Sequence, residues 1–316
     1  MQNAKKMLSI HTTDLCNNRC IFCIVDSPCQ TKQQVSREKI DAFLEENRDS
    51  GYVAVNLHGG ETTTRRDVLD LLEKIQECGY SEIILQTNAR KLSDIDFARK
   101  VIERGVCLVV VSMHGKDSAT HDSITRVSGS FEQAMQGIRN VKTLGASVRT
   151  NTVVSKMNQG QIQEIASLLI NEGVDHINIS ALHTAGTAYR NFDQVTPRYR
   201  DVESEVVATA VMVDKAKVQI TLEGFPYCCI RGAENYVIEW ENEQFKMLFR
   251  SFVYDDYSEM MDRMHRVHGT PCMKCERKSI CGGVYKEYAA KIGWSEIGYN
   301  YGINMPRVED VNAIAR

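Results

Sequence analysis

The strongest constraint on the fold is a repeated alternation between residues 5 and 222. Short β-branched apolar runs alternate with amphipathic stretches of helical period, which is typical of parallel βαβ units. Each run is short enough to be a buried strand rather than a helix. Six or seven strands are predicted, at Met7–Thr12, Val53–Leu57, Glu82–Gln86, Cys107–Ser112, Ser147–Val154, His176–Ser180 and Val218–Leu222.

Helix starts are marked by capping patterns. Thr64 and Ser130 each stand three places before an acidic or amide residue, which is a capping-box pattern that predicts a helix start. A third helix is predicted after Gln161, and a fourth from Thr196 with Pro197 in its first turn. The apolar stripes of these helices are expected to pack as core.

The chain is long enough for one large domain, or one large and one small domain. It has 316 residues, of which 43% are hydrophobic, so a scaffold held mainly by disulfides is excluded. The βα units suit a full or partial TIM-type barrel, or a doubly wound sheet. After Gly224 the alternation stops, and Tyr236–Trp240 and Phe245–Phe249 are predicted to form a hairpin, followed by a helix near Tyr285–Lys291. This segment is poor in apolar residues and is expected to need a cross-link, such as a bound metal, in order to fold.

Charge and hydropathy exclude several classes of partner. The formal net charge is -3, and no stretch concentrates basic side chains, so nucleic acid is not an expected partner. The N-terminal residues lack the apolar core of a secretory signal, and no apolar run approaches the ~20 residues of a membrane span. The sequence therefore predicts a cytoplasmic protein without a membrane partner.

Eleven cysteines in a chain without an export signal indicate metal or redox chemistry rather than disulfides. Four of them crowd the start of the chain, two adjoin at Cys228 and Cys229, and three crowd the end. Two metal sites are therefore predicted.

The first group is a loop with C-x3-C-x-aromatic-C spacing. Cys16, Cys20 and Cys23 follow the first predicted strand, and Phe22 is the aromatic residue. A structural zinc site needs four closed ligands, whereas a cubane iron–sulfur cluster held by three cysteines keeps one iron open for another ligand. This spacing resembles the signature of the radical S-adenosylmethionine (radical SAM) superfamily.

The resemblance implies a partial (βα)6 TIM-type barrel of class α/β over residues 1–222. It also implies a catalytic 4Fe-4S cluster whose open iron binds S-adenosylmethionine (SAM), with Phe22 beside the cofactor. In this family an electron from the cluster cleaves SAM to a 5′-deoxyadenosyl radical, which abstracts hydrogen from an unactivated carbon. Zinc and a plain electron-transfer cluster are the alternatives.

Gly59, Gly60 and Glu61 follow the second predicted strand. Two glycines let the backbone approach a ligand, and a carboxylate can accept hydrogen bonds from an ammonium, although such a triplet also occurs in ordinary turns. In this position the triplet is similar to the family's motif for the SAM amino group. Members usually continue with Pro, and Thr62 departs from that pattern without changing the glycines or the carboxylate.

Further cofactor-binding residues are implied at the ends of the next strands. The resemblance assigns to SAM the side chains of Asn88, Ser112, Arg149 and Asn151. Ordinary hydrogen bonding at strand ends is the alternative. His114 and His121 are expected to be structural rather than to face substrate.

The last cysteines offer a second site. Cys272, Cys275 and Cys281 lie in one loop, and either Cys228 or Cys229 can supply a fourth thiolate. The arrangement resembles the twitch and SPASM extensions that hold an auxiliary 4Fe-4S cluster, here over residues 223–316 and closer to the twitch form. Zinc bound by the same four thiolates is the alternative.

One of the adjacent cysteines would then be spare. Successive side chains of an extended segment point to opposite faces, so a thiol of Cys228 or Cys229 is a candidate catalytic hydrogen-atom donor, as in radical SAM epimerases. The alternative is a small buried hydrophobic residue. Cys29 and Cys107 are weaker candidates for the same role.

The sequence thus predicts a radical SAM enzyme that ends in epimerisation or oxidation of its substrate. A carbohydrate-like or other natural product is the favoured substrate, with a ribosomal peptide next, since the cysteines begin too early for a leader-binding domain to precede them. The family implies an electron donor such as flavodoxin or ferredoxin. A non-enzymatic two-cluster redox protein and a zinc-stapled binding module are the alternatives.

Overall fold

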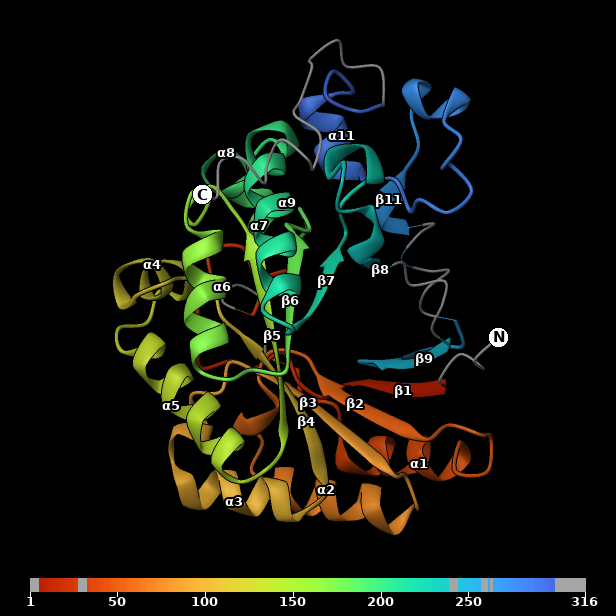
Figure 1. Cartoon of the computed structure of the whole chain (residues 1–316). Coiled ribbons are helices and arrows are strands. Elements are labelled where there is room, and N and C mark those ends of the chain that lie inside the picture. Colours follow the sequence, from red (N-terminus) through yellow and green to blue (C-terminus); the bar gives the residue numbers. More distant parts are fainter. Residues whose placement is uncertain (1–5, 28–32, 239–243, 257–260, 262–263, 299–316) are drawn as a thin grey trace.

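A computed structural model describes residues 6–27, 33–238, 244–256, 261 and 264–298. All seven predicted strands are confirmed to within one residue at each end. They are β1 (Lys6–His11), β2 (Ala54–His58), β3 (Glu82–Thr87), β4 (Val106–Ser112), β5 (Ser147–Val154), β6 (His176–Ala181) and β7 (Gln219–Glu223). They lie side by side in chain order and are all parallel, as successive βαβ units require (Figure 1).

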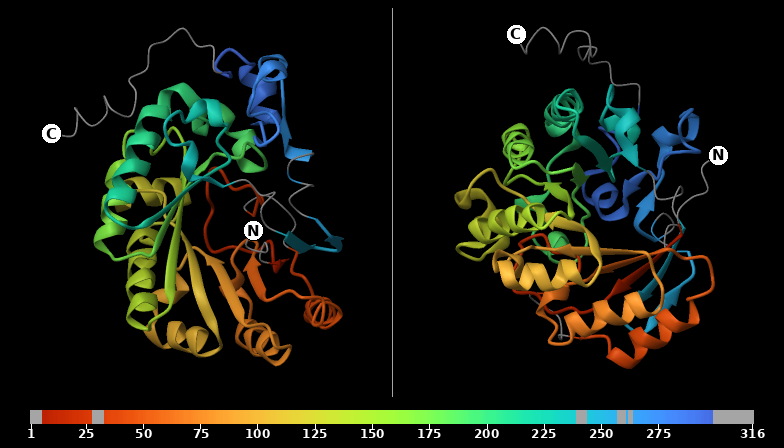
Figure 2. Two further views of the ribbon diagram at one scale, coloured as in Figure 1. Left: turned by 45° about the vertical axis from the view of Figure 1, so that its right-hand side comes forward. Right: turned by 60° about the horizontal axis from the view of Figure 1, so that its bottom comes forward.

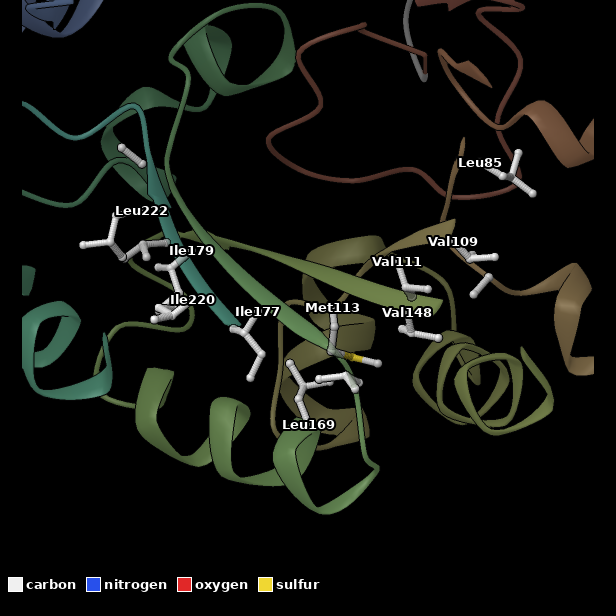
Figure 3. Packing of buried hydrophobic residues seen from close by; sticks show 14 of the residues in the cluster. Leu85, Val109, Val111, Met113, Val148, Leu169, Ile177, Ile179, Ile220 and Leu222 are labelled. Atoms are coloured by element: carbon white, nitrogen blue, oxygen red, sulfur yellow. The ribbon is translucent and has the colours of Figure 1, made fainter. Parts of the chain in front are cut away.

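Helices α2, α3, α5, α6 and α9 cover the outer face of this curved sheet (Figures 1 and 2). The α-helices are α1 (Arg37–Glu46), α2 (Val68–Glu77), α3 (Ile95–Glu103), α4 (Ser118–Thr125), α5 (Ser130–Thr143), α6 (Ile162–Asn171), α7 (Thr187–Arg190), α8 (Phe192–Val195), α9 (Tyr199–Lys215) and α11 (Lys286–Ile292). The main core lies between the sheet and these helices, and Figure 3 shows Leu169 of α6 facing strand residues such as Val148 and Ile177.

Three predicted helix starts were wrong. Thr64 ends a 3-10 turn over Thr62–Thr64 and donates its hydroxyl to the backbone of Glu61. The Ser130 hydroxyl bonds to Asp122 instead of capping, so Gly129 is the N-cap of α5. Helix α9 begins three residues after Thr196, with Arg198 as its N-cap. In the first two cases a competing hydrogen bond engages the hydroxyl that would have capped the helix.

The predicted hairpin after β7 was also wrong. Strand β8 (Val237–Ile238) pairs parallel with β7, whereas β9 (Gln244–Phe249) pairs parallel with β1 and antiparallel with β10 (Phe252–Tyr254). Strands β8 and β9 therefore lie toward opposite ends of the ten-stranded sheet, where each satisfies the open backbone groups of an edge strand. Among the described residues β8 does not pair with β10, so the barrel is partial.

The last described residues form a small unit at the top of Figure 1. Strands β11 (Arg266–Val267) and β12 (Val284–Tyr285) pair antiparallel and enclose the loop of the last cysteines. Helix α11 follows, which confirms the predicted short helix. Within the part of the chain that the structure describes, no helix is long and apolar enough to cross a membrane.

Candidate functional site

The first cysteine loop packs directly against the turn that follows β2. The N–H of Gly60 donates to the carbonyl of Thr13 at 2.6 Å. A Cβ atom on Gly60 would lie 2.3 Å from the carbonyl oxygen of Leu15, and one on Gly59, whose φ is +138°, would lie 2.5 Å from that of Thr13. Only glycine fits at either position. The two glycines therefore hold the chain that leads into Cys16.

The carboxylate of Glu61 joins the ends of β2 and β3. It is fully buried, and its Oε1 accepts from the N–H and hydroxyl of Thr63 and from the hydroxyl of Thr87 at 2.8 Å. Its Oε2 accepts from the N–H of Asn88 at 2.7 Å. A carboxylate oxygen can accept two bonds, so Oε2 has acceptor capacity beyond this one donor within the described residues.

Asn88 also reaches the cysteine loop. Its side-chain Nδ2 donates to Oδ1 of Asn17 at 2.6 Å and lies 3.8 Å from Sγ of Cys16, which also accepts from the N–H of Asn18 at 3.3 Å. Such donors orient and stabilise a cluster-bound thiolate. The sequence singled out Asn88 for SAM, and the structure places it between Glu61 and the first thiol.

The thiols of Cys16 and Cys20 are protonated before a metal binds. Burial and the nearby charge of Glu61 raise the pKa of Cys16 to about 12, and burial also raises the pKa of Cys20. A cluster would release these protons on binding. Three thiols in one loop, with N–H donors aimed at a sulfur, fit a 4Fe-4S cluster that leaves one iron open.

Within the described ranges, no three His, Cys, Asp or Glu side chains are grouped so as to hold a single metal ion. The thiols of a cubane cluster each bind a different iron, so they stand further apart than the ligands of one ion.

Helix α7 holds the opposite side of the loop. The N–H of Thr187 donates to the carbonyl of Cys23 at 2.9 Å, and a Cβ on Gly186 would lie 2.5 Å from the same oxygen. The buried Asp26 forms an ion pair with Arg190. Sequence reasoning missed these residues because about 160 residues separate the two segments, and no local pattern links them.

Phe22 is buried behind the loop rather than exposed beside it. Its ring lies edge-on to that of His114, with centroids 5.1 Å apart. The Nδ1 atom of His114 accepts the N–H of Val153, and that of His121 accepts the N–H of His114. Burial lowers the pKa of His114 to about 3 and of His121 to about 4, so both rings are neutral and structural.

Three residues assigned to SAM share the inner face of the sheet. Ser112 and Asn151 are register partners on β4 and β5, and Arg149 lies two residues before Asn151 on the same face. All three are partly exposed. Val111 and Val148, which directly precede Ser112 and Arg149, point to the other face of the sheet and are buried in the main core. The structure therefore brings these three predicted residues together.

Polar side chains continue across the inner face of β5 to β7. The side-chain Oδ1 of Asn151 accepts from Nδ2 of Asn178 at 2.9 Å and from the hydroxyl of Ser180 at 2.6 Å. Asn178 also donates to Glu223 at 2.9 Å. A closed TIM barrel fills this space with branched aliphatic side chains. An amide, hydroxyl and carboxylate lining is instead suited to a polar ligand.

The later cysteines surround a second recess. It is lined by four thiol residues, Cys228, Cys272, Cys275 and Cys281. The N–H of Gly298 donates to Sγ of Cys228 at 3.4 Å, and that of Gly283 to Sγ of Cys281 at 3.4 Å. A set of four thiols with backbone donors fits an auxiliary 4Fe-4S cluster.

Cys229 lies outside this recess. The adjacent cysteines belong to a 3-10 turn over Tyr227–Cys229, so the extended backbone expected for them was wrong. Their sulfurs are 3.9 Å apart, and Cys229 is buried with its Sγ 3.9 Å from the carbonyl oxygen of Glu296. A hydrogen bond from Cys229 lowers the pKa of Cys228 to about 7, while the pKa of Cys229 is raised by the same bond and by burial.

The rival donor Cys107 has no special environment in the structure. Cys107 is exposed near the start of β4, at the edge opposite the cysteine loops, where its thiol lies 3.5 Å from the carbonyl of Ile83. Cys29 lies outside the described residues. A hydrogen-donor role for any of these cysteines stays a prediction.

A family model described as the radical SAM superfamily matches residues 10–169. A probable GTP 3′,8-cyclase from Sulfurisphaera tokodaii is 30% identical over 187 residues, which is 59% of each chain. One from Saccharolobus solfataricus is 29% identical over 203 residues, covering 63% of this chain and 64% of that protein. The chain thus spans less than two thirds of the length of these curated relatives.

Solved structures of similar fold cover more of the chain. Streptococcus suis SuiB bound to precursor peptide SuiA has a TM-score of 0.65 at 16% identity, over 92% of this chain and 73% of that one. Native anSMEcpe with bound AdoMet and Kp18Cys peptide has a TM-score of 0.62 at 13% identity, over 98% of this chain and 94% of that one. At these identities the likeness shows the fold.

Proposed function

The chain belongs to the radical SAM superfamily, and from this premise we propose that it uses SAM to abstract hydrogen from a polar small-molecule substrate. The observation that carries the proposal is the loop of Cys16, Cys20 and Cys23, clamped by Gly60 against β2. When bound there, a reduced 4Fe-4S cluster with SAM supplies the 5′-deoxyadenosyl radical. The cluster and SAM are the cofactors that the family implies.

The residues around the loop support a seat for SAM. Oε2 of Glu61 retains acceptor capacity for the SAM ammonium beside its bond from Asn88. Ser112 and Asn151 can donate to the carboxylate or ribose, and the guanidinium of Arg149 adds a positive charge on the same face. The two glycines keep this turn close to the loop.

A second 4Fe-4S cluster is proposed at the recess lined by Cys228, Cys272, Cys275 and Cys281. Cys228 is the preferred fourth ligand, since it lines the recess and Cys229 does not. This arrangement supports a twitch-like domain over residues 223–316 beside a barrel domain over 1–222. When bound, this cluster supplies an electron acceptor near the barrel mouth. Zinc is the alternative occupant.

The substrate is inferred from the inner face of the barrel. Asn151, Asn178, Ser180 and Glu223 form one hydrogen-bonded series across β5 to β7. Such a lining can form hydrogen bonds with hydroxyl, amino or carbonyl groups of a ligand. An apolar ligand would leave the polar groups of the lining without partners. A polyhydroxylated natural product or carbohydrate-like substrate is therefore favoured over an apolar peptide side chain.

Net oxidation is the proposed outcome. Epimerisation needs a thiol that faces the substrate radical, yet the contacts of Cys229 are with Cys228 and the backbone of Glu296. The substrate would lose one hydrogen atom to the 5′-deoxyadenosyl radical, then one proton to solvent and one electron to the cluster that the second recess would hold.

The experiment is an anaerobic reaction of the iron-reconstituted protein with SAM and dithionite. Formation of 5′-deoxyadenosine is expected, and its absence would contradict the proposed function. With a turned-over substrate, the same reaction in deuterated water separates the outcomes. Deuterium on the product carbon would show that a thiol quenched the radical, and oxidation would then be overturned.

A nucleotide is the second candidate substrate. Curated relatives named probable GTP 3′,8-cyclases match the chain over about three fifths of its length, and Arg277 and Lys278 line the second recess. Comparing GTP with aminoglycoside-type sugars as triggers of 5′-deoxyadenosine formation tests this candidate. A ribosomal peptide stays the alternative, tested in the same assay. An acidic electron donor such as flavodoxin or ferredoxin and a cytoplasmic location belong to the proposal.

A further inference from the structure

Two exposed arginines stand together on the outside of the first cysteine loop. Arg19 directly precedes Cys20, and its backbone N–H donates to the carbonyl of Thr125 at 2.9 Å. This bond brings Arg19 next to Arg126, the residue that ends α4. Both side chains are exposed.

Arg90 adds a third positive charge beside them. It follows β3, and its Nη1 donates to the backbone carbonyl of Asn17 and to Oδ1 of Asn18 at 3.1 Å. Its Nε donates to Gln133 of α5. We call Arg19, Arg90 and Arg126 the arginine rim. Arg19 lies within the cysteine loop, Arg90 contacts it, and Arg126 directly follows Thr125, whose carbonyl accepts the Arg19 N–H.

No carboxylate neutralises the rim among the residues that the structure describes. The acid closest in sequence to Arg126 is Asp122, one helical turn earlier, whose oxygens are occupied by the N–H groups of Gly129 and Phe131 and the hydroxyl of Ser130. Elsewhere on the surface, Arg99, Arg104, Arg139 and Lys142 each have an acidic partner. A chain with net charge -3 thus keeps an uncompensated positive patch at this loop.

Arg126 has a backbone that disfavours a long side chain. Its φ is +56° and its ψ is +35°, the left-handed conformation that glycine or asparagine usually adopts at the end of a helix. The arginine therefore stands where the backbone alone would favour glycine.

We propose that the arginine rim is the docking surface for a small acidic one-electron carrier protein of the flavodoxin or ferredoxin class. The inference rests on the proposed function, because only a reducible cluster at Cys20 needs such a donor. Positive charge around a redox centre steers an acidic partner, and electron-transfer complexes are small and short-lived. One electron passes from the carrier, which is oxidised by one electron, to the cluster held behind the rim.

The test measures binding of oxidised flavodoxin to the reconstituted protein by fluorescence titration. The double variant Arg19→Glu/Arg126→Glu is expected to bind about tenfold or more weakly, and the salt dependence of wild-type binding should shrink with it. The matched control is Arg99→Glu/Lys100→Glu on α3, which reverses two exposed charges away from the rim. Equal weakening in both double variants, or none in the rim variant, would overturn the proposal.

Two further measurements keep the result interpretable. Arg126→Gly removes a charge while relieving the backbone, so docking should weaken although the melting temperature is equal or higher. Dithionite bypasses the carrier, so 5′-deoxyadenosine formation with dithionite should be unchanged in the rim variant. If wild type forms none, the proposed function fails whatever the docking result. If the rim variant alone loses dithionite-driven turnover of substrate, the rim binds substrate and the docking proposal is wrong.

Discussion

The backbone N–H of Asn88 donates to Oε2 of Glu61 at 2.7 Å, which ties the end of β3 to the turn after β2. The side chain of the same asparagine reaches Cys16 and Asn17 in the cysteine loop. One buried carboxylate therefore positions a residue that in turn orients the first thiol. The SAM seat and the cluster loop are parts of one hydrogen-bonded unit.

Replacing Glu61 by Gln should destabilise the apoprotein by about 2–3 kcal/mol. The new amide NH2 must face at least one of the donors that now point at the carboxylate, which leaves buried donors unsatisfied. Urea unfolding measures the change. Glu164→Gln, which breaks only the exposed pair with Lys116, is the matched control and should cost less than about 1 kcal/mol. Equal effects of the two variants would contradict the buried role of Glu61.

Gly60→Ala should lower the iron content of the reconstituted protein. The added Cβ would lie 2.3 Å from the backbone oxygen of Leu15, so the chain leading to Cys16 has to move. Gly160→Ala is the control, because no atom lies within 4 Å of its added Cβ. That variant is strained by its φ of +82°, and it should lose stability but keep its iron. Full iron content in Gly60→Ala would show that the contact is dispensable.

The adjacent cysteines should differ in iron binding. Wild type with two clusters is expected to hold about eight irons per chain. Cys228→Ser should retain about four, because this residue lines the second recess. Cys229→Ser, which changes a residue outside the recess, should retain all of them. Iron analysis after anaerobic reconstitution decides, and loss of iron in Cys229→Ser would reverse the assignment.

Apoprotein stability should fall as pH drops below about 6.5. His114 is neutral in the fold because its pKa is lowered to about 3, whereas in the unfolded chain it takes up a proton near pH 6.5. The unfolded state therefore binds more protons between these values, and each such histidine removes about 1.4 kcal/mol of stability per pH unit. The loss stops below the folded pKa.

His114→Gln tests this linkage. The amide oxygen of glutamine can accept the N–H of Val153 but takes up no proton in this range. Urea unfolding at a series of pH values should give a shallower acid slope than in wild type. The half-buried His58 and His183, whose pKa values desolvation also lowers to about 3, should account for part of the remaining slope. If the unfolding free energy of His114→Gln depended on pH as steeply as that of wild type, His114 would not contribute to the acid destabilisation.

Local patterns were sufficient for the strands and for the cysteine groups. Each of the seven strands is a short apolar run whose burial on both faces or alternate faces is visible in its own residues. The early thiols lie in one loop, so their spacing alone indicated a three-ligand site. Helix starts were less predictable, because Ser130 finds Asp122 as a partner and Thr64 finds the backbone of Glu61.

The pairing of strands that are distant in sequence could not be predicted from the sequence. No local sequence pattern indicates that Val237–Ile238 pairs with β7 or that Gln244–Phe249 pairs with β1 toward the other end of the sheet. Both choices depend on which edge has open backbone groups after the barrel has formed. The contact of Arg190 with Asp26 escaped for the same reason.

Residue order along the chain was enough to reveal the parallel sheet, the three-thiol loop and the family, because each of these lies within a short segment. The folded chain was needed to show that Cys228 and not Cys229 lines the second recess, that Phe22 is buried, and that amides line the inner face of β5 to β7. These features depend on which segments meet in space. Backbone hydrogen bonds, competing side-chain hydrogen bonds and packing determine which segments come into contact. The residue spacing within one segment does not contain this information.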